Sequence, residues 1–306
     1  MRLLVTGATG LLGLNLCLAA SKGGHIVTGL AHSRGLHNIP FELIKIDLTN
    51  SNQALKAIEA VHPDAIIHCA AIANMNTARE HPEMTMKVNG EVPGILAEAA
   101  KRLGIRFLHI STDAVFDGTK GDYVETDPTS PLSIYARTKL AGEGAVLAAN
   151  QDAIIARVVF FGWSLSGSRS LSEFFFNHLK AGESIKGFTD TFFSPLYVEH
   201  LAKILLDMVA SDLAGVFHVV SLEKLSKYDF GTRIAKKFGF DPELIEPIRG
   251  GEVDRGASRS LNLHLKPDKA QEALGYTFPT VDDGIDSMYQ RWQEGYPDYL
   301  QNLAVI

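Results

Sequence analysis

Short apolar runs alternate with amphipathic segments through the first half of the chain. The runs have the length and composition of buried strands, and they lie at Arg2–Thr6, His25–Leu30, Glu42–Ile46, Ala65–His68, Phe107–Ile110 and Ala153–Val159. The segments between them are typical of helices, and they lie at Leu11–Ser21, Ser51–Ala60, Pro82–Arg102 and Ile134–Ala149, with a kink expected at Pro93. This alternation predicts an α/β protein with a Rossmann-type doubly wound parallel sheet, covered by helices on both faces.

The pattern changes after about residue 160, where the connections become longer. Helices are expected at Arg169–Ala181, Val198–Ala210, Lys227–Phe238, Pro267–Leu274 and Val281–Glu294, with a brief strand at Gly215–Val219. No linker rich in Gly, Ser or Pro separates the two halves. We therefore predict a dinucleotide-binding domain at residues 1–160 and a smaller, mostly helical substrate lobe at residues 161–306. The boundary is soft, so the second part could be threaded through the first.

Composition narrows the class of partner. A chain of 306 residues with 46% hydrophobic residues can bury a large core. The net charge of -6 and the lack of basic runs argue against nucleic acid, and no apolar run is long enough to span a membrane. The two cysteines, Cys17 and Cys69, have neither a disulfide pattern nor metal-ligand spacing. We expect a cytoplasmic protein that binds a small molecule and no metal, and that could form a homodimer.

A glycine-rich turn follows the first expected strand. Glycines permit unusual backbone angles and close approach, and a helix that begins near Leu11 would direct its unpaired N–H groups at a phosphate. A tight turn without a ligand is the alternative explanation. The motif predicts a dinucleotide pyrophosphate site, to which we assign Gly7, Thr9, Gly10, Leu11, Leu12 and Gly13.

The end of the second expected strand distinguishes NAD from NADP. It reads Ala31-His32-Ser33-Arg34, with one certain cation and no carboxylate. An acidic residue there would bind the adenosine ribose of NAD, whereas His32, Ser33 and Arg34 suit a 2′-phosphate. Arg34 could instead be a solvated loop charge. The predicted cofactor is NADP(H).

The remaining expected cofactor contacts follow three other strands. They are Asp47 and Leu48 after the third strand, Cys69, Ala70 and Ala71 after the fourth, and Ser111 at the fifth. Asp47 could meet the adenine amino group or serve as a turn residue. The small residues after the fourth strand would let a cofactor lie across the strand end.

Tyr135 and Lys139 are four residues apart in an expected helix, so they share one face. A free phenol has a pKa of about 10, and a neighbouring ammonium stabilises its phenolate. Tyr135 could then be the general acid for a carbonyl that receives hydride, or the base for an alcohol that loses it. Thr112 could align the reacting oxygen. Tyr135 and Lys139 also count as cofactor contacts, because the ammonium could meet the nicotinamide ribose.

Together these motifs resemble the extended short-chain dehydrogenases/reductases, specifically the dTDP-4-dehydrorhamnose reductase group. The resemblance covers nearly the whole chain and rests on the Gly7 to Gly13 turn, Ser111-Thr112-Asp113-Ala114-Val115-Phe116-Asp117-Gly118, and Tyr135 to Lys139 followed by Leu140-Ala141-Gly142-Glu143. It implies NADPH-dependent reduction of a 4-keto group on a nucleotide-linked deoxysugar. It also implies that Thr112, Tyr135 and Lys139 form the catalytic triad, and that Asn89 resembles the group's helix asparagine near the active site.

Two departures from the group concern the substrate. Members usually carry a tyrosine where this chain has Ala114, and a Trp-rich stretch where it reads Val158-Val159-Phe160-Phe161-Gly162-Trp163. By resemblance, both positions face the sugar. The expected substrate contacts are Thr112, Asp113, Ala114, Phe160, Phe161 and Arg255.

Two alternative functions stay open. The first is a nucleotide-sugar epimerase, which would keep its cofactor bound and usually prefers NAD. The missing carboxylate after the second strand argues against this function. A non-catalytic regulatory subunit like that of methionine adenosyltransferase resembles the same group and also binds NADP.

Overall fold

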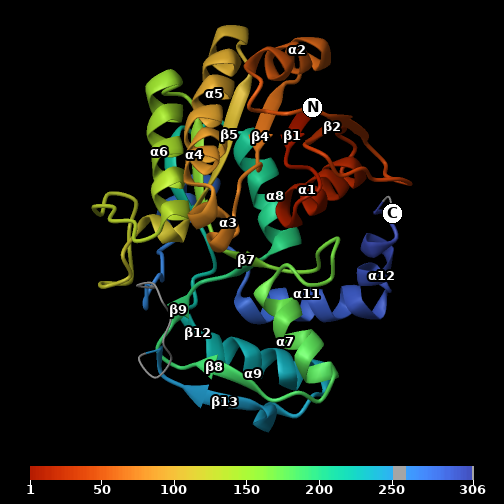
Figure 1. Ribbon diagram of the computed structural model, residues 1–306, viewed down its shortest axis with the longest axis vertical. Helices are drawn as coiled ribbons and strands as arrows, with labels where there is room; N and C mark the ends of the chain where they lie inside the picture. Colours follow the sequence, from red (N-terminus) through yellow and green to blue (C-terminus); the bar gives the residue numbers. More distant parts are fainter. Residues whose placement is uncertain (251–259, 305–306) are drawn as a thin grey trace.

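A seven-stranded parallel sheet forms the centre of the computed structural model, which describes residues 1–250 and 260–304 (Figure 1). The strand order is β11-β6-β5-β4-β1-β2-β3. The bounds are β1 (Arg2–Thr6), β2 (Ile26–Ala31), β3 (Glu42–Lys45), β4 (Ala65–His68), β5 (Arg106–Thr112), β6 (Ile154–Val158) and β11 (Gly215–Val219). The order reverses between β1 and β4, as in a doubly wound sheet. The predicted Rossmann-type α/β fold is therefore confirmed.

Helices cover both faces of the sheet because successive strand residues point to opposite sides. Leu4 packs in one core with α2 (Ser51–Val61), α5 (Val92–Leu103) and α6 (Ile134–Ala149). Leu3 and Val5 pack in the other core with α1 (Leu11–Lys22) and α8 (Val198–Val209). Within the described ranges, no helix is long and apolar enough to cross a membrane.

The helix expected at residues 82–102 is interrupted. It begins as α4 (Pro82–Met86), widens into a π-helical turn at Lys87–Glu91 and continues as α5. Pro93 lies in the first turn of α5, directly after the π turn, and it cannot donate a backbone hydrogen bond to the turn before it. A short helix, α3 (Met75–Glu80), precedes this unit. The irregularity thus falls just before the proline, and it places Asn89 in the π turn.

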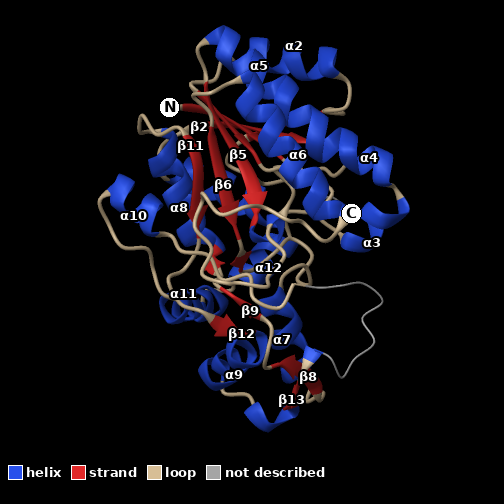
Figure 2. Ribbon diagram, turned by 90° about the vertical axis from the view of Figure 1, so that its left-hand side faces the viewer, coloured by secondary structure: helices blue, strands red, loops and turns tan. Residues whose placement is uncertain are grey.

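The second half of the chain does not form a separate body. Its strand β11 pairs with β6, and α8 packs on α1, so this part returns to the sheet domain after residue 160. The smaller part contains α7 (Leu171–Lys180), α9 (Lys227–Phe238), β8 (Ile185–Phe188) and β13 (Ile245–Ile248), and α11 (Val281–Gln293) contacts α9 there. The remaining elements are β7 (Phe160–Phe161), β9 (Phe192–Phe193), β10 (Leu196–Tyr197), β12 (Leu225–Ser226), α10 (Asp268–Leu274), α12 (Tyr296–Gln301), and 3-10 turns at Asp113–Val115 and Pro242–Leu244. Figure 2 shows the carboxyl ends of the sheet strands directed toward the smaller part.

The last described residues pack beside the loop that follows β2. The His37 backbone N–H donates to the Leu303 carbonyl at 2.9 Å, and Leu36 forms an antiparallel bridge with Ala304. The Tyr296 hydroxyl of α12 donates to Asn15 Oδ1 of α1 at 2.9 Å. The C-terminal segment therefore holds the stretch of chain that carries the predicted cofactor-selecting residues (Figure 1).

Candidate active site

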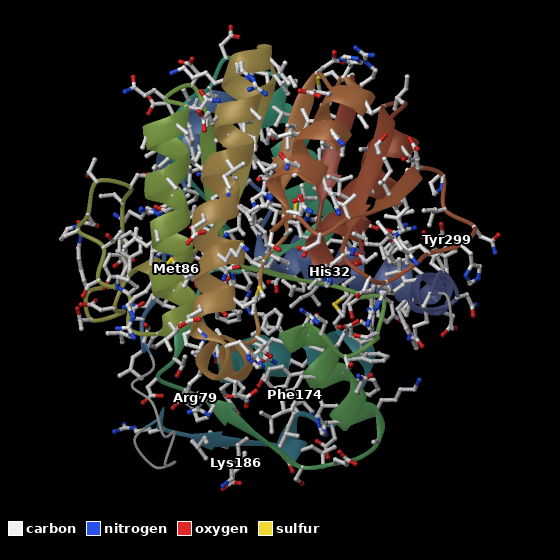
Figure 3. All side chains as sticks on the ribbon, turned by 45° about the horizontal axis from the view of Figure 1, so that its top comes forward. His32, Arg79, Met86, Phe174, Lys186 and Tyr299 are labelled. Carbon is white, nitrogen blue, oxygen red and sulfur yellow. The ribbon has the colours of Figure 1, made fainter. Side chains whose placement is uncertain are left out.

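A cavity of about 550 Å³ lies at the carboxyl ends of β1, β2 and β4. It is lined by most of the predicted cofactor residues: Gly7, Thr9, Gly10, Leu11, His32, Ser33, Arg34, Asp47, Leu48, Cys69, Ala70 and Ala71. Figure 3 shows His32 on the side of the sheet domain that faces the smaller part. This cavity has the location at which doubly wound sheets bind their ligands.

The glycine turn has the geometry of a phosphate-binding loop. Gly7 has a φ of +67°, and a Cβ there would lie 2.8 Å from the backbone nitrogen of Ala70. A Cβ on Gly13 would lie 2.2 Å from the Gly7 carbonyl oxygen. Helix α1 follows Gly10 without a side-chain cap, so its first N–H groups remain available to a ligand. The turn therefore combines close backbone packing with free donors.

Five predicted cofactor residues do not line this cavity: Leu12, Gly13, Ser111, Tyr135 and Lys139. Leu12 and Gly13 are buried in α1, where Gly13 permits the turn to close. The Ser111 hydroxyl donates to Glu143 Oε1 at 2.5 Å, and Glu143 in turn binds Arg157. The Ser111 side chain is thus engaged inside the protein.

Arg34 and Asp47, the two charged residues predicted to contact the adenosine part of the cofactor, have different surroundings. Arg34, at the end of β2, is exposed and lines the cavity. Asp47 accepts hydrogen bonds from the Thr49 hydroxyl at 2.8 Å and its backbone N–H at 2.9 Å, and these bonds lower the pKa of Asp47. Asp47 therefore forms a turn and lines the cavity at the same time.

Sequence reasoning missed one wall of the cavity. Ser164, Leu165, Ser166 and Arg169 line it from the segment between β7 and α7. A capping box of Ser170 and Glu173 anchors the start of α7, and the buried Glu173 carboxylate also accepts a bond from the Ser164 N–H at 2.6 Å. The Ser-x-x-Glu spacing was the available signal for this anchored helix start.

Thr112 and Tyr135 are joined by a side-chain hydrogen bond, and neither residue lines the cavity. Thr112 Oγ1 donates to Asp113 Oδ1 at 3.0 Å and accepts from the Ala114 N–H at 3.2 Å. Burial raises the pKa of Tyr135 to about 12, against the opposing effect of its hydrogen bond with Thr112. Desolvation of the phenolate is the largest cause of this shift, and the expected stabilisation of the phenolate by Lys139 stays a prediction.

Lys139 is buried one helical turn after Tyr135. Its Nζ lies 3.1 Å from His109 Nε2. Burial lowers the pKa of Lys139 to about 8, while the nearby Glu143 carboxylate opposes this shift. The charge of Lys139 also acts on the thiol of Cys69, which lines the cavity. Lys139 thus interacts electrostatically with one lining residue of the cavity without lining it itself.

The residues expected to contact the substrate differ in how deeply they are buried. Asp113 is buried, which raises its pKa to about 6, and Ala114 is half-buried in the following 3-10 turn. Phe161 is buried, and its ring packs in the core with its centroid 5.0 Å from that of Phe230. Phe160 is half-buried in β7. Arg255 lies outside the described residues.

Asn89 has a clear structural role. Its Oδ1 accepts from the Ile72 N–H at 2.8 Å, and its Nδ2 donates to the Ile72 carbonyl at 3.0 Å and to Thr138 Oγ1 at 3.1 Å. These bonds tie the segment after β4 to the helix that carries Tyr135 and Lys139. The π turn presents the amide to both partners.

The fold, its glycine turn and the Thr112, Tyr135 and Lys139 positions define the class of extended short-chain dehydrogenases/reductases. Within that class the chain belongs to the RmlD substrate binding domain family, whose profile matches residues 1–294. The resemblance to the dTDP-4-dehydrorhamnose reductase group is thereby confirmed.

Three curated relatives show the range of this family. A probable low-salt glycan biosynthesis reductase, Agl14, of Haloferax volcanii is 33% identical over 96% of this chain and 98% of its own. The dTDP-4-dehydrorhamnose reductase of Mycobacterium tuberculosis is 33% identical over 85% of this chain and 83% of its own. Methionine adenosyltransferase 2 subunit beta of Bos taurus is 30% identical over 90% of this chain and 82% of its own.

Solved structures agree with the fold. A hypothetical dTDP-4-dehydrorhamnose reductase from Sulfolobus tokodaii superposes with a TM-score of 0.80 at 30% identity, over 93% of this chain and 99% of its own. The Bacillus anthracis dTDP-4-dehydrorhamnose reductase in complex with NADP has a TM-score of 0.82 at 22% identity, over 95% and 99% of the two chains.

Proposed function

We propose that this protein is an NADPH-dependent reductase of a 4-keto nucleotide-sugar. The observation that carries the proposal is the cavity at the glycine turn, which is lined by Arg34 after β2 and by Cys69, whose thiol interacts electrostatically with Lys139. Family membership supports a nucleotide-sugar reductase, because relatives matched along most of the chain are named as reductases, one of them as a dTDP-4-dehydrorhamnose reductase.

The cavity residues fit a dinucleotide. The free N–H groups at the start of α1 suit a pyrophosphate, and the Arg34 guanidinium suits a 2′-phosphate. The bound cofactor would supply a hydride. Thr112 would turn its hydroxyl from Asp113 to the substrate carbonyl oxygen, and Tyr135 would donate the proton that this oxygen gains. A phenol whose pKa is raised to about 12 stays protonated at neutral pH, which is the form a general acid requires.

Cofactor preference is the first testable consequence. Wild-type protein should bind NADPH more tightly than NADH, and Arg34→Ala should reduce that preference by about tenfold or more, since the 2′-phosphate loses a charge-assisted partner. Titration of cofactor fluorescence measures both dissociation constants. The matched control is Arg102→Ala, because Arg102 is exposed on α5 away from the cavity. Equal wild-type affinities for the two cofactors would contradict the proposal.

Substrate choice is the second consequence. Ala114 lacks the phenol that the group usually has there, so the site should hold dTDP-4-dehydrorhamnose weakly or accept a bulkier, less polar sugar. Ala114→Tyr should raise kcat/KM for dTDP-4-dehydrorhamnose, relative to other 4-keto sugars, by about tenfold, the value of one good hydrogen bond. The assay is NADPH oxidation with a panel of sugars. A wild-type kcat/KM of about 10⁵ M⁻¹s⁻¹ for dTDP-4-dehydrorhamnose would show that this departure is neutral.

The similarity to methionine adenosyltransferase 2 subunit beta favours one second candidate, a regulatory subunit that binds NADP without turnover. The same panel separates the two. Tight NADPH binding with no oxidation by any nucleotide-linked 4-keto sugar would favour the regulatory subunit. Inversion at C4 of a nucleotide-linked sugar that carries a C4 hydroxyl, with no net change in the oxidised cofactor, would instead indicate an epimerase.

A further inference from the structure

A buried histidine, His109, contacts Lys139. Lys139 Nζ and His109 Nε2 are 3.1 Å apart, and both residues are almost fully buried. His109 is on β5, directly opposite His68 on β4, and the two rings stack with centroids 5.3 Å apart. Gly142, on the next turn of α6, leaves room for the Asn89 carbonyl oxygen, since a Cβ there would lie 2.3 Å from that atom.

The stacked pair is tied to the cofactor cavity. His68 Nδ1 lies 2.7 Å from Thr6 Oγ1, and that hydroxyl accepts from the Ala70 N–H at 3.1 Å. Ala70 lines the cavity beside the glycine turn. Contacts therefore run from Lys139 on α6 to Thr6 on β1, with a polar contact at each outer ring nitrogen and ring stacking between His109 and His68.

Burial and the charges around His109 determine its protonation state. Burial, Lys139 and His68 hold the pKa of His109 well below its ordinary value, so its ring is neutral and can accept a hydrogen bond at Nε2. The other groups that face Lys139 are Glu143 on its own helix and Cys69 after β4. Removal of a hydrogen-bond acceptor destabilises a buried ammonium more than an exposed one, because no water molecule replaces the lost bond.

We propose that His109 is a positioning residue for the reaction: its neutral ring accepts a hydrogen bond from Lys139 and holds the ammonium where it serves Tyr135 and the cofactor. The inference rests on the proposed function. A bond to the charged form of a group favours that form, so His109 also keeps Lys139 protonated. Because the pKa of Lys139 is lowered to about 8, loss of this acceptor should lower it further and discharge the lysine near neutral pH.

Two variants test the acceptor. His109→Phe keeps an aromatic ring against His68 but removes the acceptor, whereas His109→Gln restores a side-chain oxygen. The pKa of Lys139 is read by NMR of ¹³C-labelled lysine, with its signal assigned by Lys139→Met. Cofactor affinity is read by NADPH fluorescence, and the pH profile of kcat/KM by NADPH oxidation.

We expect His109→Phe to lower the Lys139 pKa by about one unit, to move the alkaline limb of the pH profile down by the same amount, and to weaken NADPH binding about tenfold. His109→Gln should stay within about threefold of wild type in affinity. Circular dichroism checks that each variant folds, and His109→Leu replaces His109→Phe if the latter does not.

An unchanged Lys139 pKa in the variant without an acceptor would overturn the inference, as would equal losses in His109→Gln and His109→Phe. The NMR and fluorescence measurements need no sugar substrate. A wild-type protein that reduces no sugar, while Lys139 still responds to His109, would therefore refute the proposed reaction and leave the positioning contact intact.

Discussion

Tyr135→Phe should lower kcat/KM for a validated 4-keto sugar by about 10²- to 10⁴-fold, the range typical of a lost general acid. The phenylalanine keeps the shape of the ring and removes the proton that the carbonyl oxygen must gain. NADPH affinity should change by less than about threefold, because the phenol is not required to hold the cofactor. Steady-state NADPH oxidation and fluorescence titration measure the two quantities separately.

The matched control for this variant is Tyr299→Phe, since Tyr299 is exposed on α12 (Figure 3). Its rate should equal that of wild type. The pKa of Tyr135, raised to about 12, also predicts that ionisation of this phenol causes no loss of rate below about pH 10. Full rate in Tyr135→Phe would show that another group supplies the proton.

Local sequence signals predicted the sheet domain well. Each strand from β1 to β6 is a short apolar run, and the glycine turn needs only neighbouring residues to define it. The Tyr135–Lys139 pair was readable because α6 places residues four apart on one face. These features depend on contacts over a few residues, so the chain itself contains the information.

Features that depend on distant pairing were not predictable. β11 joins the sheet only because it pairs with β6, some sixty residues earlier, and its own run does not reveal that partner. Phe161 lies in a two-residue strand, too short for an alternating pattern to say which side faces the core. The contact between Lys139 and His109 likewise joins a helix to a strand thirty residues away.

The buried ion pair of Arg157 and Glu143 underlies the second large prediction. Arg157 donates from Nε to Glu143 Oε1 at 3.0 Å and from its terminal nitrogen to Oε2 at 2.7 Å, with both side chains about 5% exposed or less. The guanidinium also lies over the Phe116 ring, 5.1 Å from its centroid. The carboxylate receives the Ser111 bond as well and faces Lys139. The pair therefore connects β5 and β6 with α6, the helix that carries Tyr135 and Lys139.

Arg157→Met should reduce the free energy of unfolding by about 3–5 kcal/mol, because the single change leaves Glu143 buried without its partner. The double variant Arg157→Met with Glu143→Met removes both charges and should recover most of that loss. Urea denaturation measures both, and Arg102→Ala, which breaks an exposed pair with Glu59, should change stability by less than about 0.5 kcal/mol. Although its stability recovers, the double variant should reduce the sugar substrate more slowly than wild type, since Lys139 loses the carboxylate that raises its pKa. Equal destabilisation of the single and double variants would mean that packing around Arg157, rather than the unpaired carboxylate, causes the loss.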